Sequence, residues 1–72
     1  MSVDTVIAIF SRVLETDGIT ADSDFFALGG DSLIATRVLS AVARESGAEL
    51  SFEDFLAAPT PEALVKRVAG TA

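Results

Sequence analysis

Asp24-Phe25-Phe26-Ala27-Leu28-Gly29-Gly30-Asp31-Ser32-Leu33 is the stretch around which the chain is organised. Two glycines loosen the backbone, an Asp-Ser pair follows them, and a helix-forming run begins immediately afterwards. Ser32 therefore lies at the mouth of a helix, where four backbone N–H groups lack intrahelical partners and favour an anion. We interpret Ser32 as the site of a covalently attached phosphate group. The structural alternative is that Gly-Gly forms a turn and that Asp31 or Ser32 is only the N-cap.

Composition excludes several classes of function. The 72 residues suffice for one small domain, which we place at 1–72. Because cysteine and histidine are absent, a disulfide framework, a Cys or imidazole catalytic group and a His-ligated zinc site are excluded. A net charge of −6 argues against binding to nucleic acid or to an anionic membrane. The only aromatic residues are five Phe, so we expect a mainly aliphatic core.

The chain carries no recognisable membrane or export signal. Its apolar runs are too short to span a bilayer, and no basic segment followed by an apolar core marks a secretory signal. We therefore expect a cytoplasmic location, and we separately expect the protein to be a monomer. Met1 directly before the domain is typical of a freestanding protein, although a domain excised from a longer chain could begin in the same way.

The first helix is predicted from Ser2 or Asp4 to about Leu14. Its apolar residues fall within an arc of roughly 120° at 100° per residue, as in an amphipathic helix. These are Val3, Val6, Ile7, Phe10, Val13 and Leu14. Ile9 falls outside this arc, so we expect it to be exposed.

A long connection, residues 15–31, follows this helix. Gly18 and the polar run 20–24 argue against a continuous helix there. Loops of this length are usually functional or held down by their own side chains. Here four apolar residues could hold the loop on the core: Ile19, Phe25, Phe26 and Leu28. We expect at least one of the two Phe, together with Leu28, to be buried.

The second helix is predicted from Ser32 to about Ser46, with Gly47 ending it. Residues at spacing i, i+3, i+4, i+7 form its core stripe: Ala35, Val38, Leu39 and Val42. With this stripe inward, Leu33 lies on the solvent face in line with Arg37 and Arg44, and Ile34 lies at the edge. A lone exposed Leu is ordinary, but beside a candidate modification site it is better interpreted as a contact point for partners.

Two further helices complete an all-α fold without a strand pattern. Ser51 with Asp54 predicts a capping box for a short helix that places Phe52 and Phe55 on the core. The last helix begins with Thr60 as N-cap and Pro61 as its first residue, and we expect Gly70 to end it. The sequence thus predicts a small four-helix bundle, with three longer helices and one short one.

Asp24 to Leu33 resembles the DxFFxLGGxSL signature of peptidyl carrier proteins, the thiolation domains of nonribosomal peptide synthetases within the acyl carrier protein-like family. The resemblance extends through the whole chain, including the Pro59-Thr60-Pro61 start of the last helix. It implies a non-catalytic carrier in nonribosomal peptide or related natural-product biosynthesis. Ser32 would bear 4′-phosphopantetheine, installed from coenzyme A by a phosphopantetheinyl transferase, and the arm's thiol would hold aminoacyl, aryl or peptidyl thioesters. The absence of cysteine fits this role.

The resemblance also assigns roles to the neighbours of Ser32. Gly30, like Gly29, would let the transferase approach the backbone. Asp31 would either assist the transferase, through its metal ion or a basic side chain, or act only as N-cap. Asp31 stands where His is frequent in this family, which leaves the class of cargo open.

Partner enzymes would contact the outer face of the second helix at Leu33, Ile34, Arg37 and Arg44. These partners would include an adenylation enzyme or domain and condensation, tailoring or thioesterase domains. Fatty-acid carriers usually present acids along this helix, whereas residues 32–46 carry Arg37 and Arg44 against Glu45, a charge of +1. Two alternatives remain: an acyl carrier protein of a polyketide or fatty-acid system, and an unmodified helical interaction module. The two arginines could also be simply solvated.

Overall fold

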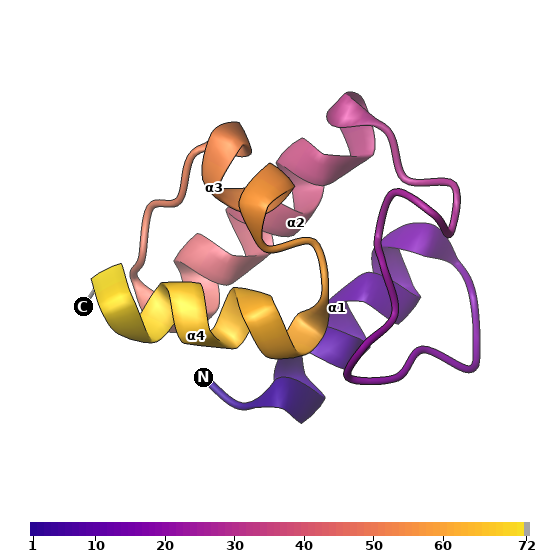
Figure 1. Ribbon diagram of the computed structural model, residues 1–72, viewed down its shortest axis with the longest axis horizontal. Coiled ribbons are helices and arrows are strands. Elements are labelled where there is room, and N and C mark those ends of the chain that lie inside the picture. Colours follow the sequence, from indigo (N-terminus) through magenta and orange to yellow (C-terminus); the bar gives the residue numbers. More distant parts are fainter. Residues whose placement is uncertain (72) are drawn as a thin grey trace.

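The computed structural model describes residues 1–71 and shows an all-α bundle of four helices (Figure 1). Their bounds are α1 Val3–Leu14, α2 Ser32–Ser46, α3 Phe52–Ala57 and α4 Pro61–Thr71. The prediction of three longer helices and one short one is confirmed, as is the long connection between the first two. Within residues 1–71 no helix has the length and apolar character needed to cross a membrane.

The helix ends follow the capping residues that the sequence predicts. Gly47 ends α2 with φ of 76°, as predicted, and Ser2 caps α1, a role that the sequence pattern had not assigned to it. The capping box of Ser51 and Asp54 is present at the start of α3, and Thr60 Oγ1 accepts a hydrogen bond from the Ala63 N–H at 3.2 Å. The prediction that Gly70 ends α4 is wrong, because the helix continues to Thr71. A single exposed glycine costs a helix only about 1 kcal/mol and does not by itself stop it.

Three phenylalanines form a cluster at the centre of the core, and the other buried hydrophobic residues are aliphatic, as the composition predicts. Phe10, Phe25 and Phe55 are fully buried. Their ring centroids lie 4.9 to 5.9 Å apart, within the range of favourable edge and tilted aromatic pairs. Each ring comes from a different segment (α1, the 15–31 connection and α3), so the cluster joins elements that are far apart in sequence.

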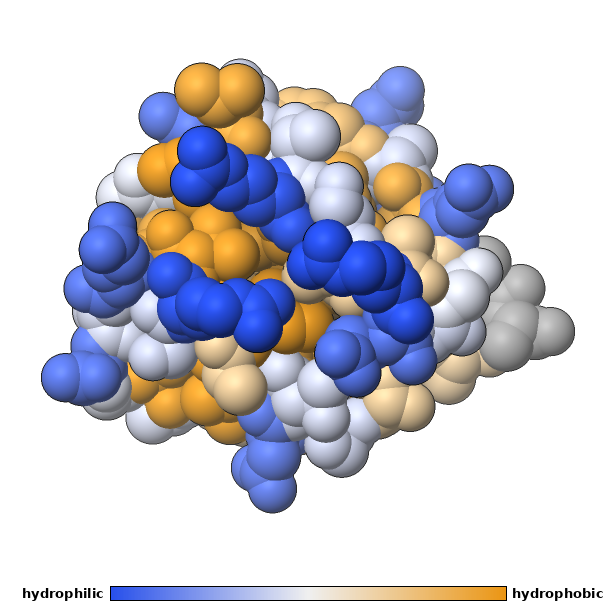
Figure 2. Space-filling model, turned by 180° about the vertical axis from the view of Figure 1, so that it is seen from behind, coloured by the Kyte–Doolittle hydropathy of each residue, from blue (hydrophilic) through white to orange (hydrophobic). Residues whose placement is uncertain are grey.

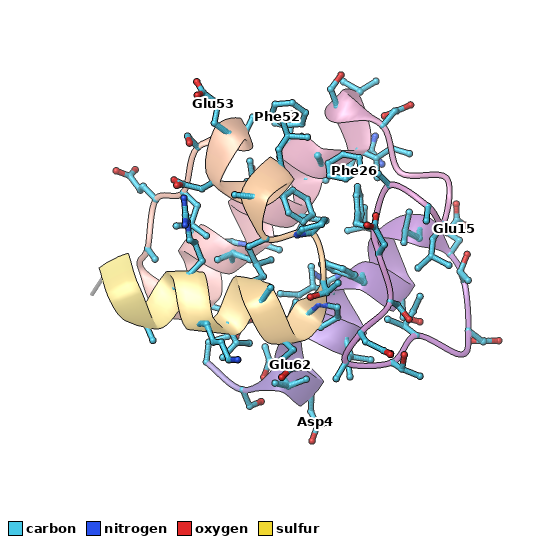
Figure 3. The ribbon with its side chains drawn as sticks, in the orientation of Figure 1. Asp4, Glu15, Phe26, Phe52, Glu53 and Glu62 are labelled. Carbon is cyan, nitrogen blue, oxygen red and sulfur yellow. The ribbon has the colours of Figure 1, made fainter. Side chains whose placement is uncertain are left out.

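The buried surface differs from the predicted one at two helices. Ile9 is only 3% exposed, against expectation, because α1 packs against both α2 and α4 and buries more than one arc. On α3 only Phe55 is buried, whereas Phe52 is 37% exposed. Phe52 points toward Phe26, with a centroid distance of 6.1 Å (Figure 3). A helix of six residues has one face to bury, and that face belongs to Phe55.

The 15–31 connection is fixed by backbone hydrogen bonds to the last helix and the segment before it. The N–H of Phe25 donates to the Pro59 carbonyl at 2.9 Å, and the N–H of Glu62 donates to the Ala21 carbonyl at 3.0 Å. Phe25 is fully buried, as predicted for one of the two Phe, but Leu28 is 39% exposed and that prediction is wrong. The turn after Asp24 directs Phe25 inward and leaves Leu28 at the surface.

Candidate functional site

The start of α2 is held by Asp31, not by Ser32. The Asp31 side chain accepts a hydrogen bond from the Ile34 N–H at 2.9 Å, and its backbone carbonyl accepts one from the Ala35 N–H at 2.8 Å. Ser32 is therefore the first helical residue. This geometry resolves which of the two residues is the N-cap.

Ser32 presents an exposed hydroxyl that no neighbour uses. Within residues 1–71, its Oγ has no hydrogen bond, and neither do the N–H groups of Ser32 and Leu33. Unpaired N–H groups at a helix N-terminus are suited to an anionic oxygen. A phosphodiester on Ser32 Oγ would lie beside these groups, so the residues present fit a phosphate-linked arm.

Gly30 has a packing role that the sequence analysis did not foresee. A Cβ on Gly30 would overlap the Phe25 ring, lying 2.8 Å from Cζ and closer still to two other ring carbons. The N–H of Gly30 also donates to the Phe25 carbonyl at 3.0 Å. Position 30 must therefore be glycine for the packing of this protein itself, independently of any enzyme that approaches Ser32. Gly29 differs, because it has φ of 97° and open space where a Cβ would lie.

The outer face of α2 is arranged as the periodicity predicts. Leu33 is 74% exposed and Ile34 is half-buried, while Ala35, Val38 and Val42 are fully buried. Leu39 is only partly buried, and Ala41 adds to the buried side. Arg37 and Arg44 are exposed, and neither forms an ion pair with any residue that the structure describes.

A groove between α1 and α2 brings in a residue that sequence reasoning missed. Arg12 of α1 lines it together with Leu33, Arg37 and Arg44 of α2, and its volume is about 540 Å³. On this side of the molecule, strongly hydrophilic side chains surround an apolar surface (Figure 2). In the sequence Arg12 indicated only a basic last turn of its helix. The groove exists only once α1 packs against α2, so neither helix alone carries a signal for it.

Known proteins share both the fold and the sequence of this chain. In a solved structure of the phosphopantetheine transferase Sfp in complex with coenzyme A and a peptidyl carrier protein, one chain matches with a TM-score of 0.91 and 36% identity, covering 97% of this chain and 91% of that one. The helical bundle of this chain is thus the fold of a carrier protein. Residues 4–68 match the family described as "Phosphopantetheine attachment site", and the chain belongs to that family.

Curated relatives identify the branch of the family. The chain is 44% identical over 57 residues to the probable non-canonical nonribosomal peptide synthetase CymA of Salinispora arenicola, covering 79% of this chain and 1% of that protein. It is 38% identical over 64 residues to surfactin synthase subunit 1 of Bacillus subtilis, covering 89% of this chain and 2% of that protein. The chain therefore spans a very small part of these relatives. It is a phosphopantetheine-bearing carrier domain, homologous to the thiolation domains of nonribosomal peptide synthetases.

Proposed function

We propose that Ser32 is the residue that carries the 4′-phosphopantetheine arm, and that the chain holds aminoacyl, aryl or peptidyl groups on it as thioesters. The observation that carries this proposal is the exposed Ser32 hydroxyl at the start of α2, which makes no hydrogen bond within residues 1–71. It lies inside the Asp24–Leu33 motif, within the segment that matches the family. The arm supplies the thiol that a chain without cysteine lacks.

The groups next to Ser32 would stabilise the attached phosphodiester and contact the transferase. The free N–H groups of Ser32 and Leu33 would stabilise the phosphodiester anion. Asp31 uses Oδ1 to cap the helix, while Oδ2 accepts no hydrogen bond within residues 1–71. That second oxygen is available to a metal ion or a basic side chain of the transferase. Both roles that the sequence suggested for Asp31 are therefore compatible with one conformation.

The same surface suits the enzymes that load and unload a carrier. Leu33, Ile34, Arg37 and Arg44 follow Ser32 along α2, with Leu33 and Ile34 next to the attachment point and Arg44 in the last turn of the helix. We propose that the phosphopantetheinyl transferase, an adenylation enzyme, and condensation, tailoring or thioesterase domains contact this face. Its basic character differs from the acidic helix of fatty-acid carriers, which favours a role in peptide synthesis over a fatty-acid system.

Intact mass spectrometry tests the attachment site. The chain is incubated with coenzyme A and a promiscuous phosphopantetheinyl transferase. We expect the wild type to gain one phosphopantetheine group, Ser32→Ala to gain none, and Ser51→Ala to gain one as before. Circular dichroism checks that both variants keep their helices. No adduct on the wild type, or an adduct that persists on Ser32→Ala, would contradict the proposal and leave an unmodified helical interaction module as the better interpretation.

A further inference from the structure

The groove between α1 and α2 concentrates positive charge on an acidic protein. The chain has a net charge of −6 and only five Lys and Arg residues. Three of those five, Arg12, Arg37 and Arg44, line this one groove. We call these three residues with their apolar neighbours Val13 and Leu33 the arginine groove.

Within the described chain, none of the three guanidinium groups forms an ion pair with a carboxylate. The other two cations are paired: Lys66 with Glu62 at 3.8 Å, and Arg67 with Asp54 at 3.0 Å. Glu15 also lines the groove, yet no ion pair joins it to an arginine within residues 1–71. One acid against three arginines leaves the groove with a positive charge of two. Arginine binds carboxylates through paired, charge-assisted hydrogen bonds, so the groove is suited to an anionic ligand.

The volume and the lining residues of the groove further limit the class of ligand that it can bind. Its volume of about 540 Å³ falls within the usual range for small-molecule sites, about 300–1,000 Å³. Val13 and the exposed Leu33 contribute apolar surface between the charged side chains. The ligand that fits is therefore amphipathic, with an apolar body and an anionic group such as a carboxylate.

The arginine groove lies within reach of an arm on Ser32. Thr36, one turn after Ser32, lines the groove, and its hydroxyl donates to the Ser32 carbonyl at 3.0 Å. At about 1.5 Å per residue, Arg37 and Arg44 lie roughly 7 and 18 Å along α2 from Ser32. An extended phosphopantetheine arm spans roughly 17 Å, if each of its roughly fourteen bonds adds about 1.2 Å as in an extended polypeptide.

We propose that the arginine groove binds a carboxylate carried on this chain's own arm, so that its cargo is an acyl, aminoacyl or peptidyl group with a free carboxylate. This inference rests on the proposed attachment at Ser32. Exposed ion pairs are individually weak, but tethering gives the cargo a high effective concentration at the groove. An acidic segment of a partner has no such advantage, and the net charge of −6 opposes its approach.

Two isosteric cargoes test the proposal. The transferase loads the wild type from glutaryl-coenzyme A or from 5-methylhexanoyl-coenzyme A, in which an isopropyl group replaces the carboxylate. We expect the NMR signals of the arginine Nε–H groups, with the methyl signals of Val13 and Leu33, to shift only for the glutaryl form. We also expect hydroxylamine to cleave the glutaryl thioester about threefold more slowly than the 5-methylhexanoyl thioester, because the arm bound in the groove is held against the protein surface.

Matched variants identify the residues responsible. Replacing Arg12, Arg37 and Arg44 by Gln should abolish the glutaryl-specific shifts and the slower cleavage, whereas Lys66→Gln should change neither. Sodium chloride at high concentration should act like the triple variant, since it screens exposed pairs. Equal shifts for both cargoes would overturn the proposal, and so would shifts that follow only addition of a partner protein. Intact mass shows whether each arm was loaded, so a failure of attachment is distinguishable from a failure of the groove.

Discussion

The starts of α2 and α3 use the same two residue types with opposite results. At α3, Ser51 is the N-cap, and its Oγ accepts from the Asp54 N–H and donates to Asp54 Oδ2, each at 3.1 Å. At α2 the acid comes first, so Asp31 is the cap and Ser32 is the first helical residue. The Ser51 hydroxyl is engaged, while the Ser32 hydroxyl is free within the described chain. The order of acid and serine thus decides which hydroxyl is available for chemistry.

The two helix starts also differ in what supports them. Asp54 extends the α3 cap to α4, since Oδ1 accepts from Arg67 Nε at 3.2 Å and from Arg67 Nη2 at 3.0 Å. Among residues 1–71, no comparable polar network supports the start of α2. It is positioned by the close approach of Gly30 to the buried Phe25 ring. One helix start is held by charged groups at the surface and the other by packing from below, which leaves its outer side open.

Gly30→Ala should have the largest effect, because it breaks the packing that positions the α2 start. The new Cβ would overlap the Phe25 ring, and overpacking of this kind costs typically about 1–3 kcal/mol. We expect the free energy of unfolding of Gly30→Ala, measured by urea unfolding, to fall by an amount near the upper end of that range. Gly29→Ala is the matched control, since it meets no atom within 4 Å and has only its φ of 97° to accommodate; its loss should be about 1 kcal/mol.

A second substitution separates overlap from backbone strain. If the Phe25 ring is the obstacle, Phe25→Leu should cost less stability in the Gly30→Ala background than in the wild type. Equal losses for Gly29→Ala and Gly30→Ala, or full additivity of the Phe25 and Gly30 changes, would contradict this account of the motif.

Replacing each serine by alanine tests the comparison itself. Ser51→Ala removes an N-cap, which costs about 0.5–2 kcal/mol, so its free energy of unfolding should fall by about 1 kcal/mol. Ser32→Ala removes a hydroxyl that makes no hydrogen bond within residues 1–71, so the change should stay within about 0.5 kcal/mol. Urea unfolding of the unmodified proteins measures both. A larger loss for Ser32→Ala than for Ser51→Ala would mean that Ser32 has a structural role.

The sequence was most informative where one helix decides the outcome. Period and capping residues predicted the exposure of Leu33, the inward stripe of α2 and the capping box of Ser51, because each depends on residues within a turn or two. Ile9 was predicted wrongly because a second neighbour of α1 covers it. Leu28 was predicted wrongly because a turn, which has no simple period, sets the direction of its side chain.

The same distinction, between features set within one helix and features set by contacts between elements, applies to the candidate site. Ser32 could be proposed from its motif, but the choice between Asp31 and Ser32 as N-cap needed the backbone geometry. The constraint on Gly30 comes from Phe25, five residues earlier and on the far side of a turn. Arg12 lies twenty-five residues before Arg37 in the sequence, and only the packing of α1 against α2 brings both to one groove. Contacts between elements are what a single sequence does not display.

Acid should remove the stability that the ionised Asp54 side chain contributes at the start of α3, and this is the smallest of the expected effects. The backbone N–H of Ser51, followed by the Arg67 guanidinium, lowers the pKa of Asp54 below its ordinary value of 3.8. A carboxyl with a lower pKa in the folded state stabilises the fold above the unfolded-state pKa, and this contribution disappears as the pH falls through the folded-state pKa. The difference in thermal midpoint between wild type and Asp54→Asn should therefore be full at pH 7 and shrink below about pH 3.8.

Arg67→Gln tests whether the Ser51 N–H or the Arg67 guanidinium contributes more to the lowered pKa of Asp54. Because the Ser51 N–H is the largest single cause of the lowered Asp54 pKa, the Asp54-dependent loss of stability in acid should be reduced but still present in Arg67→Gln. Carbon NMR titration of the Asp54 carboxyl gives the same information directly, as a folded-state pKa that moves only part of the way back toward 3.8. Complete loss of the shift in Arg67→Gln would mean that the ion pair to α4, and not the capping box, holds the α3 start.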